Sequence, residues 1–233
     1  GFAIAERMTA QIRGLNMATK NANDGLSMLG VIENATNDVT DMLHRMRELA
    51  IQATNDTNSD EDRAFLQLEV AQLKLEIDRV ATDTQYNGQE VLAGGFTSKS
   101  IQVGTEANQT ITFSVNGIKA DAIGSVDDSA YVSGIDISNA TDAQAGLQVI
   151  TDAIEQVAGD RATYGALQNR LEYTVSNLMN VAEFTTAARS RIEDADFAAE
   201  SARLAKAQVL QQTGTAMLAQ ANASSQLALS LIR

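Results

Sequence analysis

The stretch NDTNSDED carries oxygen-bearing side chains at a spacing that could bind a calcium ion. Asp56, Asn58 and Asp60 alternate along the chain, as the first ligands of an EF-hand loop do. Such a loop also needs glycine at its sixth position, for a sharp turn, and glutamate at its twelfth, as a bidentate ligand. Those positions hold Glu61 and Gln67. The sequence therefore argues against a calcium site.

The same stretch has the features of a turn that leads into a helix. Ser59 is followed three positions later by Asp62, which is the arrangement of a capping box. Acidic side chains in a first helical turn are also favoured by the helix dipole. We therefore predict a helix–helix turn that binds nothing itself.

No other residues form a convincing catalytic or metal-binding set. The single histidine, His44, is flanked by Arg45 and Glu48, which indicates a solvated surface position. There is no cysteine, so disulfides, thiolate chemistry and zinc–thiolate sites are all excluded. No glycine-rich phosphate loop follows a strand. The acidic clusters Asp127/Asp128 and Glu193/Asp194/Asp196 show no sign of the buried setting that acid–base catalysis by paired carboxylates needs. We expect neither enzymatic activity nor a metal or other cofactor.

Charge and hydropathy exclude two further classes of function. The formal net charge is −13, and no basic stripe with aromatic side chains is present, which argues against nucleic-acid binding. No apolar run reaches the length of about 18 residues that a membrane span requires. The chain contains no proline, so no helix is interrupted by that residue.

Helical periodicity dominates both halves of the sequence. Apolar residues recur at threes and fours from about 2 to 53, with a bend or break expected at Asn23-Asp24-Gly25. A second helix, with a seam of Leu66, Val70, Leu73, Ile77 and Val80, is expected to end near the Asn87-Gly88 turn signal. Leu68 and Leu75 form a second apolar edge, so we expect this helix to be covered on two sides.

The middle of the chain reads as a small β element. Residues 101–103 and 111–115 alternate at period two around a loop at 104–109, which predicts a β-hairpin. Irregular structure is expected at 116–140, with a short strand at 135–137. Thr141 and Gln144 have the spacing of a capping box. The helix that they begin is expected to continue past Thr185 for about 40 more residues.

These elements predict a mainly α fold: a long coiled-coil-like helical bundle with a small β-hairpin element. Because the sequence starts at Gly1 in the middle of an amphipathic pattern, we interpret it as lacking an amino-terminal segment.

With the elements placed, the sequence closely resembles bacterial flagellin. The resemblance covers nearly the whole chain. It is carried by NANDGLSM (21–28), RMRELAIQATNDTNSDEDR (45–63), EIDRVATDTQYNGQEVL (76–92), RLEYTVSNLMNVAEFTTAARSRIEDADFAAE (170–200) and AQVLQQTGTAMLAQAN (207–222), with LSLIR at the end. The middle, 116–140, is too short for the variable outer domains of many flagellins.

The resemblance implies a structural subunit of the extracellular flagellar filament. Such a subunit is exported unfolded through the flagellar secretion channel and polymerises with other flagellin subunits at the distal tip. Residues 1–190 would form an outer-core helical domain, with a β-hairpin region at about 95–140. Residues 191–233 would form the inner-core helix, whose amino-terminal partner is the segment that we interpret as absent.

Two further partners follow from the resemblance. Toll-like receptor 5 would contact Arg45, Leu49, Gln52 and Glu69. A helical export chaperone would wrap about 195–233, which also packs in the inner core. The apolar side chains that we assign to this packing are Leu204, Leu210, Met217, Leu218, Leu227 and Leu231.

Two alternative interpretations remain. A hook–filament junction protein shares parts of the terminal helices but lacks the close match across RMRELAIQ. A secreted effector or enzyme on a flagellin-like scaffold would carry a metal-binding histidine pair, and this chain has one histidine.

Overall fold

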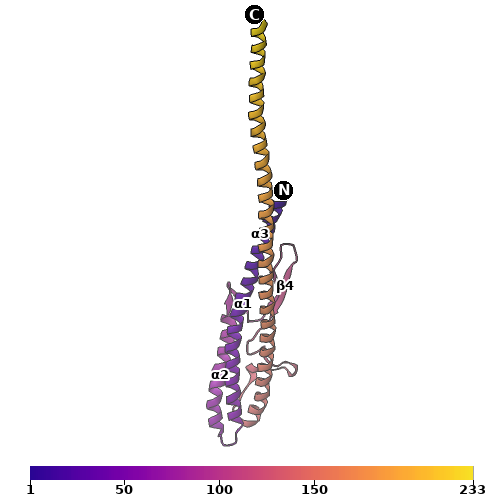
Figure 1. Ribbon diagram of the computed structural model, residues 1–233. Coiled ribbons are helices and arrows are strands. Elements are labelled where there is room, and N and C mark those ends of the chain that lie inside the picture. Colours follow the sequence, from indigo (N-terminus) through magenta and orange to yellow (C-terminus); the bar gives the residue numbers. More distant parts are fainter. Residues whose placement is uncertain (233) are drawn as a thin grey trace. The chain divides into compact units, whose positions relative to one another are not determined.

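The computed structural model describes residues 1–232, which form two compact units. The larger unit is Leu15–Met179, and the smaller one joins Gly1–Gly14 to the chain from Asn180 onward. Three helices provide most of the structure: α1 (Phe2–Thr54), α2 (Asp60–Asp83) and α3 (Ala140–Ile232) (Figure 1). The predicted mainly α fold is confirmed.

Buried residues in the larger unit recur at a spacing of seven, because that spacing keeps one stripe of a helix facing its neighbours. Core positions of α1 alternate steps of four and three, and α2 and α3 show the same repeat. The buried residues of the repeat are Ala22, Leu29, Ile32, Val39, Leu43, Met46, Ala50 and Ala53 of α1, Val70 and Ile77 of α2, and Ala143, Ile150, Val157, Tyr164 and Leu171 of α3.

The expected bend in α1 is absent, because helix is continuous through residues 23–25. Gly25 is buried in the middle of it. A Cβ at Gly25 would lie 2.4 Å from Cδ1 of Ile101 and 3.3 Å from Cδ1 of Leu171. The glycine therefore lets the β-hairpin approach the helix closely, and its cost in helix propensity is offset by that packing.

Three small antiparallel β-pairs connect α2 to α3. The first joins β1 (Gln85–Tyr86) to β2 (Gln89–Glu90) through Asn87-Gly88, both of which have positive φ angles, 52° and 76°. That geometry is the one that an Asn-Gly hairpin turn requires. The predicted hairpin is confirmed as β3 (Phe96–Gln102) and β4 (Thr110–Val115), with Ile101 opposite Ile111.

The segment between the hairpin and α3 contains β5 (Gly124–Ser125), β6 (Ala130–Tyr131) and two short 3₁₀ turns, Val126–Asp128 and Val132–Gly134. The strand expected at 135–137 is wrong. That backbone pairs with a side chain of α2: the Gln67 amide oxygen accepts from the N–H of Ile137 at 2.9 Å. The amide nitrogen of Gln67 donates to the carbonyl oxygen of Ile135 at 3.5 Å.

Two other α2 side chains hold the same segment. Lys74 Nζ donates to the carbonyl oxygens of Ser133, at 3.1 Å, and of Ile135. The Asp78 carboxylate accepts from the N–H of Ala120 at 2.8 Å. Burial lowers the pKa of the Lys74 ammonium, because these carbonyls replace only part of its hydration. Backbone groups that lack a sheet partner are thus satisfied by one helix face.

A second polar group lies where β4 meets α3. The N–H of Asn116 donates to the Tyr164 hydroxyl at 3.2 Å, and its side-chain amide donates to Asp160 at 2.9 Å. Burial raises the pKa of the Tyr164 phenol to about 12, and burial also raises the pKa of the Asp160 carboxyl. These bonds tie the end of the hairpin to the helix.

One of the two predicted capping boxes is confirmed. The Ser59 hydroxyl accepts from the N–H of Asp62 at 3.1 Å, and the Asp62 carboxylate accepts from the N–H of Ser59 at 3.0 Å. The box predicted at Thr141 and Gln144 is wrong. Asn139 caps α3 instead, its side chain exchanging two bonds with Asp142. Asparagine is among the best N-cap residues, and Asn139 directly precedes Ala140, the first residue of α3.

The expectation that α2 is covered on two sides is also wrong. Val70 and Ile77 are fully buried against the core, whereas Leu68 and Leu75 are 65% and 62% exposed. Phe65, on the same side as these leucines, is 63% exposed. Within the described residues, nothing covers this apolar edge.

We predict different outcomes for alanine at two glycines of α1. A Cβ at Gly30 meets nothing within 4 Å, so Gly30→Ala should raise the free energy of unfolding by about 0.5–1 kcal/mol through helix propensity. Gly25→Ala should lose that gain, because the side chain of Ile101 must move. Urea unfolding of the two variants checks this, and an equal gain for both would contradict the packing role of Gly25.

Candidate functional site

The exposed faces of α1 and α2 meet at an ion pair between Arg45 and Glu69. Arg45 Nε and Nη2 donate to the two Glu69 carboxylate oxygens at 3.0 and 3.2 Å, and Nη1 donates to Glu48 at 3.1 Å. Hydrogen bonding to Glu69 raises the pKa of the Arg45 guanidinium above its ordinary value. The side chains are 50% and 45% exposed, so the pair contributes little to stability and lies open to a partner.

The other two residues of the expected receptor face differ in exposure. Gln52 is exposed on α1, two turns after Arg45. Leu49 is only 2% exposed and belongs to the hydrophobic core. Because its side chain is covered within the chain, Leu49 can position the surface but does not present itself to a partner. The structure thus brings Arg45 and Glu69 together on a surface that also has Gln52 exposed.

The turn between α1 and α2 is closed by a residue that the sequence interpretation missed. Arg63 is buried, and its Nε donates to the carbonyl oxygen of Ala53 at 2.7 Å. Its Nη2 donates to the carbonyl oxygen of Asn55, and its Nη1 to Asp60, both at 3.1 Å. The guanidinium therefore caps the carbonyl end of α1 from the first turns of α2. A positive charge near the amino terminus of a helix interacts unfavourably with the helix dipole. The presence of Arg63 near the start of α2 was therefore the signal in the sequence that this residue has a specific structural role.

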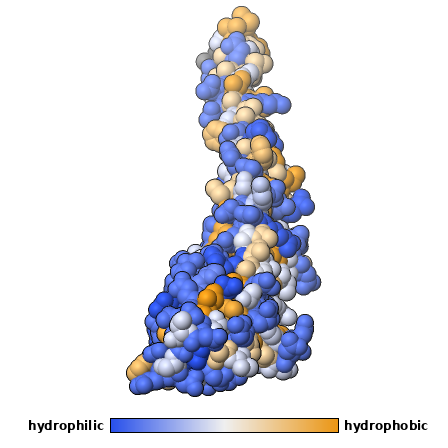
Figure 2. All heavy atoms as spheres, turned by 90° about the horizontal axis from the view of Figure 1, so that it is seen from below, coloured by the Kyte–Doolittle hydropathy of each residue, from blue (hydrophilic) through white to orange (hydrophobic). Residues whose placement is uncertain are grey.

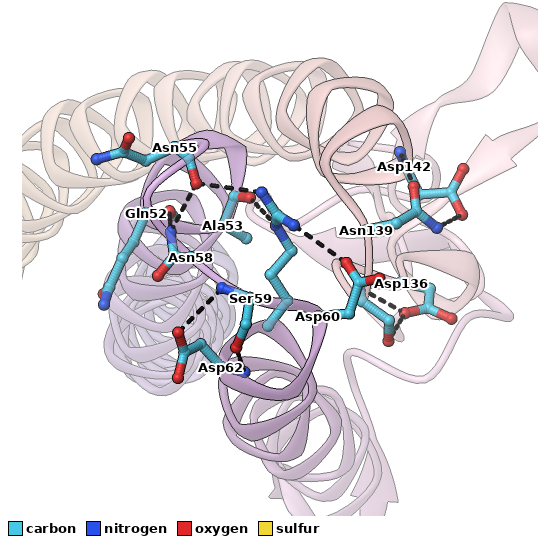
Figure 3. A network of polar contacts seen from close by, with 12 residues as sticks. Gln52, Ala53, Asn55, Asn58, Ser59, Asp60, Asp62, Asp136, Asn139 and Asp142 are labelled. Atoms are coloured by element: carbon cyan, nitrogen blue, oxygen red, sulfur yellow. Dashed lines mark hydrogen bonds and ion pairs between the residues drawn. The ribbon is translucent and has the colours of Figure 1, made fainter.

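The rest of the turn uses its polar atoms in the same way (Figure 3). The side-chain nitrogen of Asn58 donates to the carbonyl oxygens of Gln52, at 2.6 Å, and Asn55, at 2.9 Å. Carboxylate oxygens of Asp60 and Asp62 accept bonds from Arg63 and Ser59. Within residues 1–232, no group of three or more acidic, histidine or cysteine side chains is arranged to hold a metal ion.

The second candidate surface is the last part of α3, described by itself. Residues 193–232 are exposed on every side of the helix. An isolated helix in water is marginally stable, and exposed apolar residues at this density indicate a binding surface. The exposed fractions are 60% for Leu204, 61% for Leu210, 66% for Met217, 64% for Leu218, 66% for Leu227 and 81% for Leu231.

The surface of the molecule combines polar regions with exposed apolar side chains, as expected of a protein that binds other proteins. The face in Figure 2 is mostly hydrophilic, with separate hydrophobic patches. His44 is exposed beside Arg45 and is not part of any polar cluster described above. None of the described helices has an apolar run sufficient for a membrane span. Long helices with exposed binding faces are typical of structural proteins.

Sequence comparison then identifies the family. Residues 1–97 match the bacterial flagellin N-terminal helical region, and residues 147–232 match the C-terminal helical region. The flagellin of Halalkalibacterium halodurans is 40% identical over 233 residues, which are 100% of this chain and 84% of that protein. The flagellar filament 33 kDa core protein of Treponema phagedenis is 40% identical over 243 residues, which cover 100% and 85%. The chain belongs to the bacterial flagellin family, and it is a structural subunit of the extracellular flagellar filament.

Solved structures share the fold. Bacillus cereus flagellin is 28% identical with a TM-score of 0.58, covering 68% of this chain and 88% of that one. A putative flagellar hook-associated protein from Vibrio parahaemolyticus has a TM-score of 0.69 at 14% identity, covering 80% and 95%. The second likeness shows a common fold only. The sequence matches along the whole chain therefore favour flagellin over the hook–filament junction alternative.

Arg63 provides a direct test of the turn. Arg63→Ala should lower the free energy of unfolding by about 1–3 kcal/mol, because the buried carbonyl of Ala53 loses its bond to Arg63. Arg63→Lys should give an intermediate loss, since an ammonium lacks the planar fork of the guanidinium. Arg79→Ala is the matched control, because it removes two exposed ion pairs on the same helix, with Glu76 and Asp83, and should change stability by less than about 0.5 kcal/mol. Equal urea midpoints for the Arg63→Ala and Arg79→Ala variants would contradict the capping role.

Proposed function

We propose that this filament subunit is exported unfolded through the flagellar channel and completed by other chains at its carboxy-terminal helix. Residues 193–232 carry apolar side chains that are open to solvent on every side of the helix. Burying one leucine or methionine side chain contributes roughly 1.5–3 kcal/mol, so this helix gains stability from any partner that covers it. In the filament, the partners are helices of the inner core, contributed by neighbouring flagellin subunits. Before export, the partner is a helical chaperone on about 195–233.

The domain assignment follows from the same proposal. Residues 1–190 act as the outer core, which carries the hairpin region at about 95–140, and residues 191–233 act as the inner-core helix. The main support is the change in burial along α3. Leu171 is fully buried and Leu178 is 6% exposed, whereas residues 193–232 are all exposed.

We also propose that the paired faces of α1 and α2 bind Toll-like receptor 5. Arg45 and Glu69 supply opposite charges on adjacent helices, and Gln52 adds an exposed amide. Arginine in an exposed, oriented position is a frequent hot-spot residue. Leu49 supports this surface from the core, so its substitution acts through packing.

The chaperone proposal is tested with charge substitutions in the full chain. Leu210→Asp and Met217→Asp should each weaken binding of a purified flagellin export chaperone about tenfold or more, because a charge enters the apolar contact. Gln212→Asp is the matched control: it lies two residues from Leu210, on the opposite side of the helix, and should bind normally. Titration calorimetry measures the affinities. Equal weakening by all three substitutions would point to charge alone and contradict a specific role for Leu210 and Met217.

The receptor proposal is tested in reporter cells that express Toll-like receptor 5. Arg45→Ala and Glu69→Ala should each raise the concentration for half-maximal signalling about tenfold, with the far-ultraviolet helix signal unchanged. Arg79→Ala, which removes two exposed ion pairs elsewhere on α2, should signal normally.

A double charge reversal separates recognition from structure. Arg45→Glu with Glu69→Arg retains an ion pair between α1 and α2 but presents its charges in exchanged positions. Signalling should remain low in this variant if the receptor binds the positive charge at position 45 and the negative charge at position 69. Full recovery of signalling would show that the pair acts only within the fold, and undiminished signalling in both alanine variants would exclude the contact.

A further inference from the structure

The exposed edge of α2 has the spacing of a coiled-coil seam. Phe65, Leu68 and Leu75 are 62–65% exposed, and Gln72 lies between the two leucines on the same side. Steps of four and three residues extend the row to one charged residue at each end, Glu61 and Arg79, both exposed. We call these six residues the outer stripe. Its partner is not the core of its own chain, because α2 packs there through Val70 and Ile77 on another side.

The outer stripe is complementary to itself when it is reversed. Glu61 lies nine residues before Val70 and Arg79 nine residues after it. Phe65 and Leu75 are each five residues from that centre, and Leu68 and Gln72 are each two residues from it. Two antiparallel copies with a two-fold axis at this level therefore place every residue of the stripe opposite its counterpart. Self-complementarity of one surface is the requirement of a two-fold interface.

We propose that the outer stripe binds the outer stripe of a second copy of this chain in the antiparallel direction. Phe65 then packs on Leu75 of the second copy at two symmetric places, around a centre formed by Leu68 and Gln72. Glu61 meets Arg79 of the second copy at both ends. This inference goes beyond the proposed function, because it concerns a second copy of the chain and neither the receptor nor the chaperone.

Charge selects the antiparallel direction over the parallel one. A parallel pair in register would place Glu61 beside Glu61 and Arg79 beside Arg79, which is unfavourable. The Arg79 guanidinium already donates to Glu76 at 2.9 Å and to Asp83 at 3.3 Å, and its side chain remains 60% exposed. Arg79 therefore already has two acidic partners at its end of the stripe. Glu61 of a second copy must compete with Glu76 and Asp83 for the N–H donors of the guanidinium. The apolar residues Phe65, Leu68 and Leu75 consequently contribute most of the affinity.

The size of the stripe and the symmetry of the pair limit where it forms. A single helix–helix contact of this length buries less than the roughly 1,600 Å² of a standard stable interface, so the pair is weak and concentration-dependent. A helical filament grows through head-to-tail contacts, in which every subunit points the same way. A two-fold pair therefore joins free subunits, or subunits of two filaments that lie side by side in opposite directions.

Disulfide trapping tests the pair in the full chain, which has no native cysteine. Chains with Glu61→Cys are mixed with size-tagged chains with Arg79→Cys and oxidised mildly. Disulfides between the two kinds of chain should predominate, because positions 61 and 79 coincide only in the antiparallel register. Predominance of disulfides between chains of the same kind would show parallel pairing, and a random mixture would show no defined contact. Either result overturns the proposal.

Two further substitutions distinguish this contact from association through the carboxy-terminal helix. Leu68→Asp, added to both chains, should reduce the yield of the mixed disulfide about tenfold or more, because it places a charge at the apolar centre. Leu210→Asp, added in the same way, should leave the yield unchanged. Both positions are exposed, so circular dichroism should show unchanged helix content. An unaffected yield with Leu68→Asp, or a loss with Leu210→Asp, would also overturn the proposal.

Discussion

Every element of the larger unit depends on the buried seam of α1. Its core side chains form two interleaved rows, and successive residues of each row are seven positions apart. Most of these side chains are fully excluded from solvent. Thr36 is the polar member, and its hydroxyl donates to the carbonyl oxygen of Ile32 at 2.9 Å, so its burial leaves no unpaired donor. The turn, the hairpin and α3 are all placed by their contact with this helix. A chain with 4% aromatic residues thereby builds a continuous core mostly from aliphatic side chains.

The helix α2 is used on three sides, and each side has a different chemistry. One side is apolar and enters the core. The next is polar, and its Gln67, Lys74 and Asp78 side chains take the place of a neighbouring strand for the segment before α3. The third carries the outer stripe, beside Glu69. Side chains at steps of seven and eleven stay on one side of a helix, so a single short element can divide these tasks.

The sequence predicted what depends on periodicity and local chemistry. Helix types, the Ser59 capping box and the hairpin at Ile101 and Ile111 follow from spacing and turn signals within a few residues. The missed features depend on contacts between distant segments. The sequence predicts a helix break at Gly25, because the residues around it carry no information about the close contact with Ile101 of the hairpin. Leu68 and Leu49 show the same limit at the candidate sites, since an apolar residue at helical spacing does not reveal which of its neighbours covers it.

The separation along the chain of the contacting residues also determines when the larger unit can form during synthesis. The α1–α2 turn and the hairpins join residues within about 30 positions of each other, and such contacts close rapidly. The bond from Arg161 to Glu33, at 2.8 Å, joins residues 128 positions apart. The seam of α1 therefore lacks one wall until α3 has left the ribosome as far as about Leu171, its last residue in the core cluster. A nascent chain of this protein passes through a stage in which two helices are paired and their common apolar surface is still open.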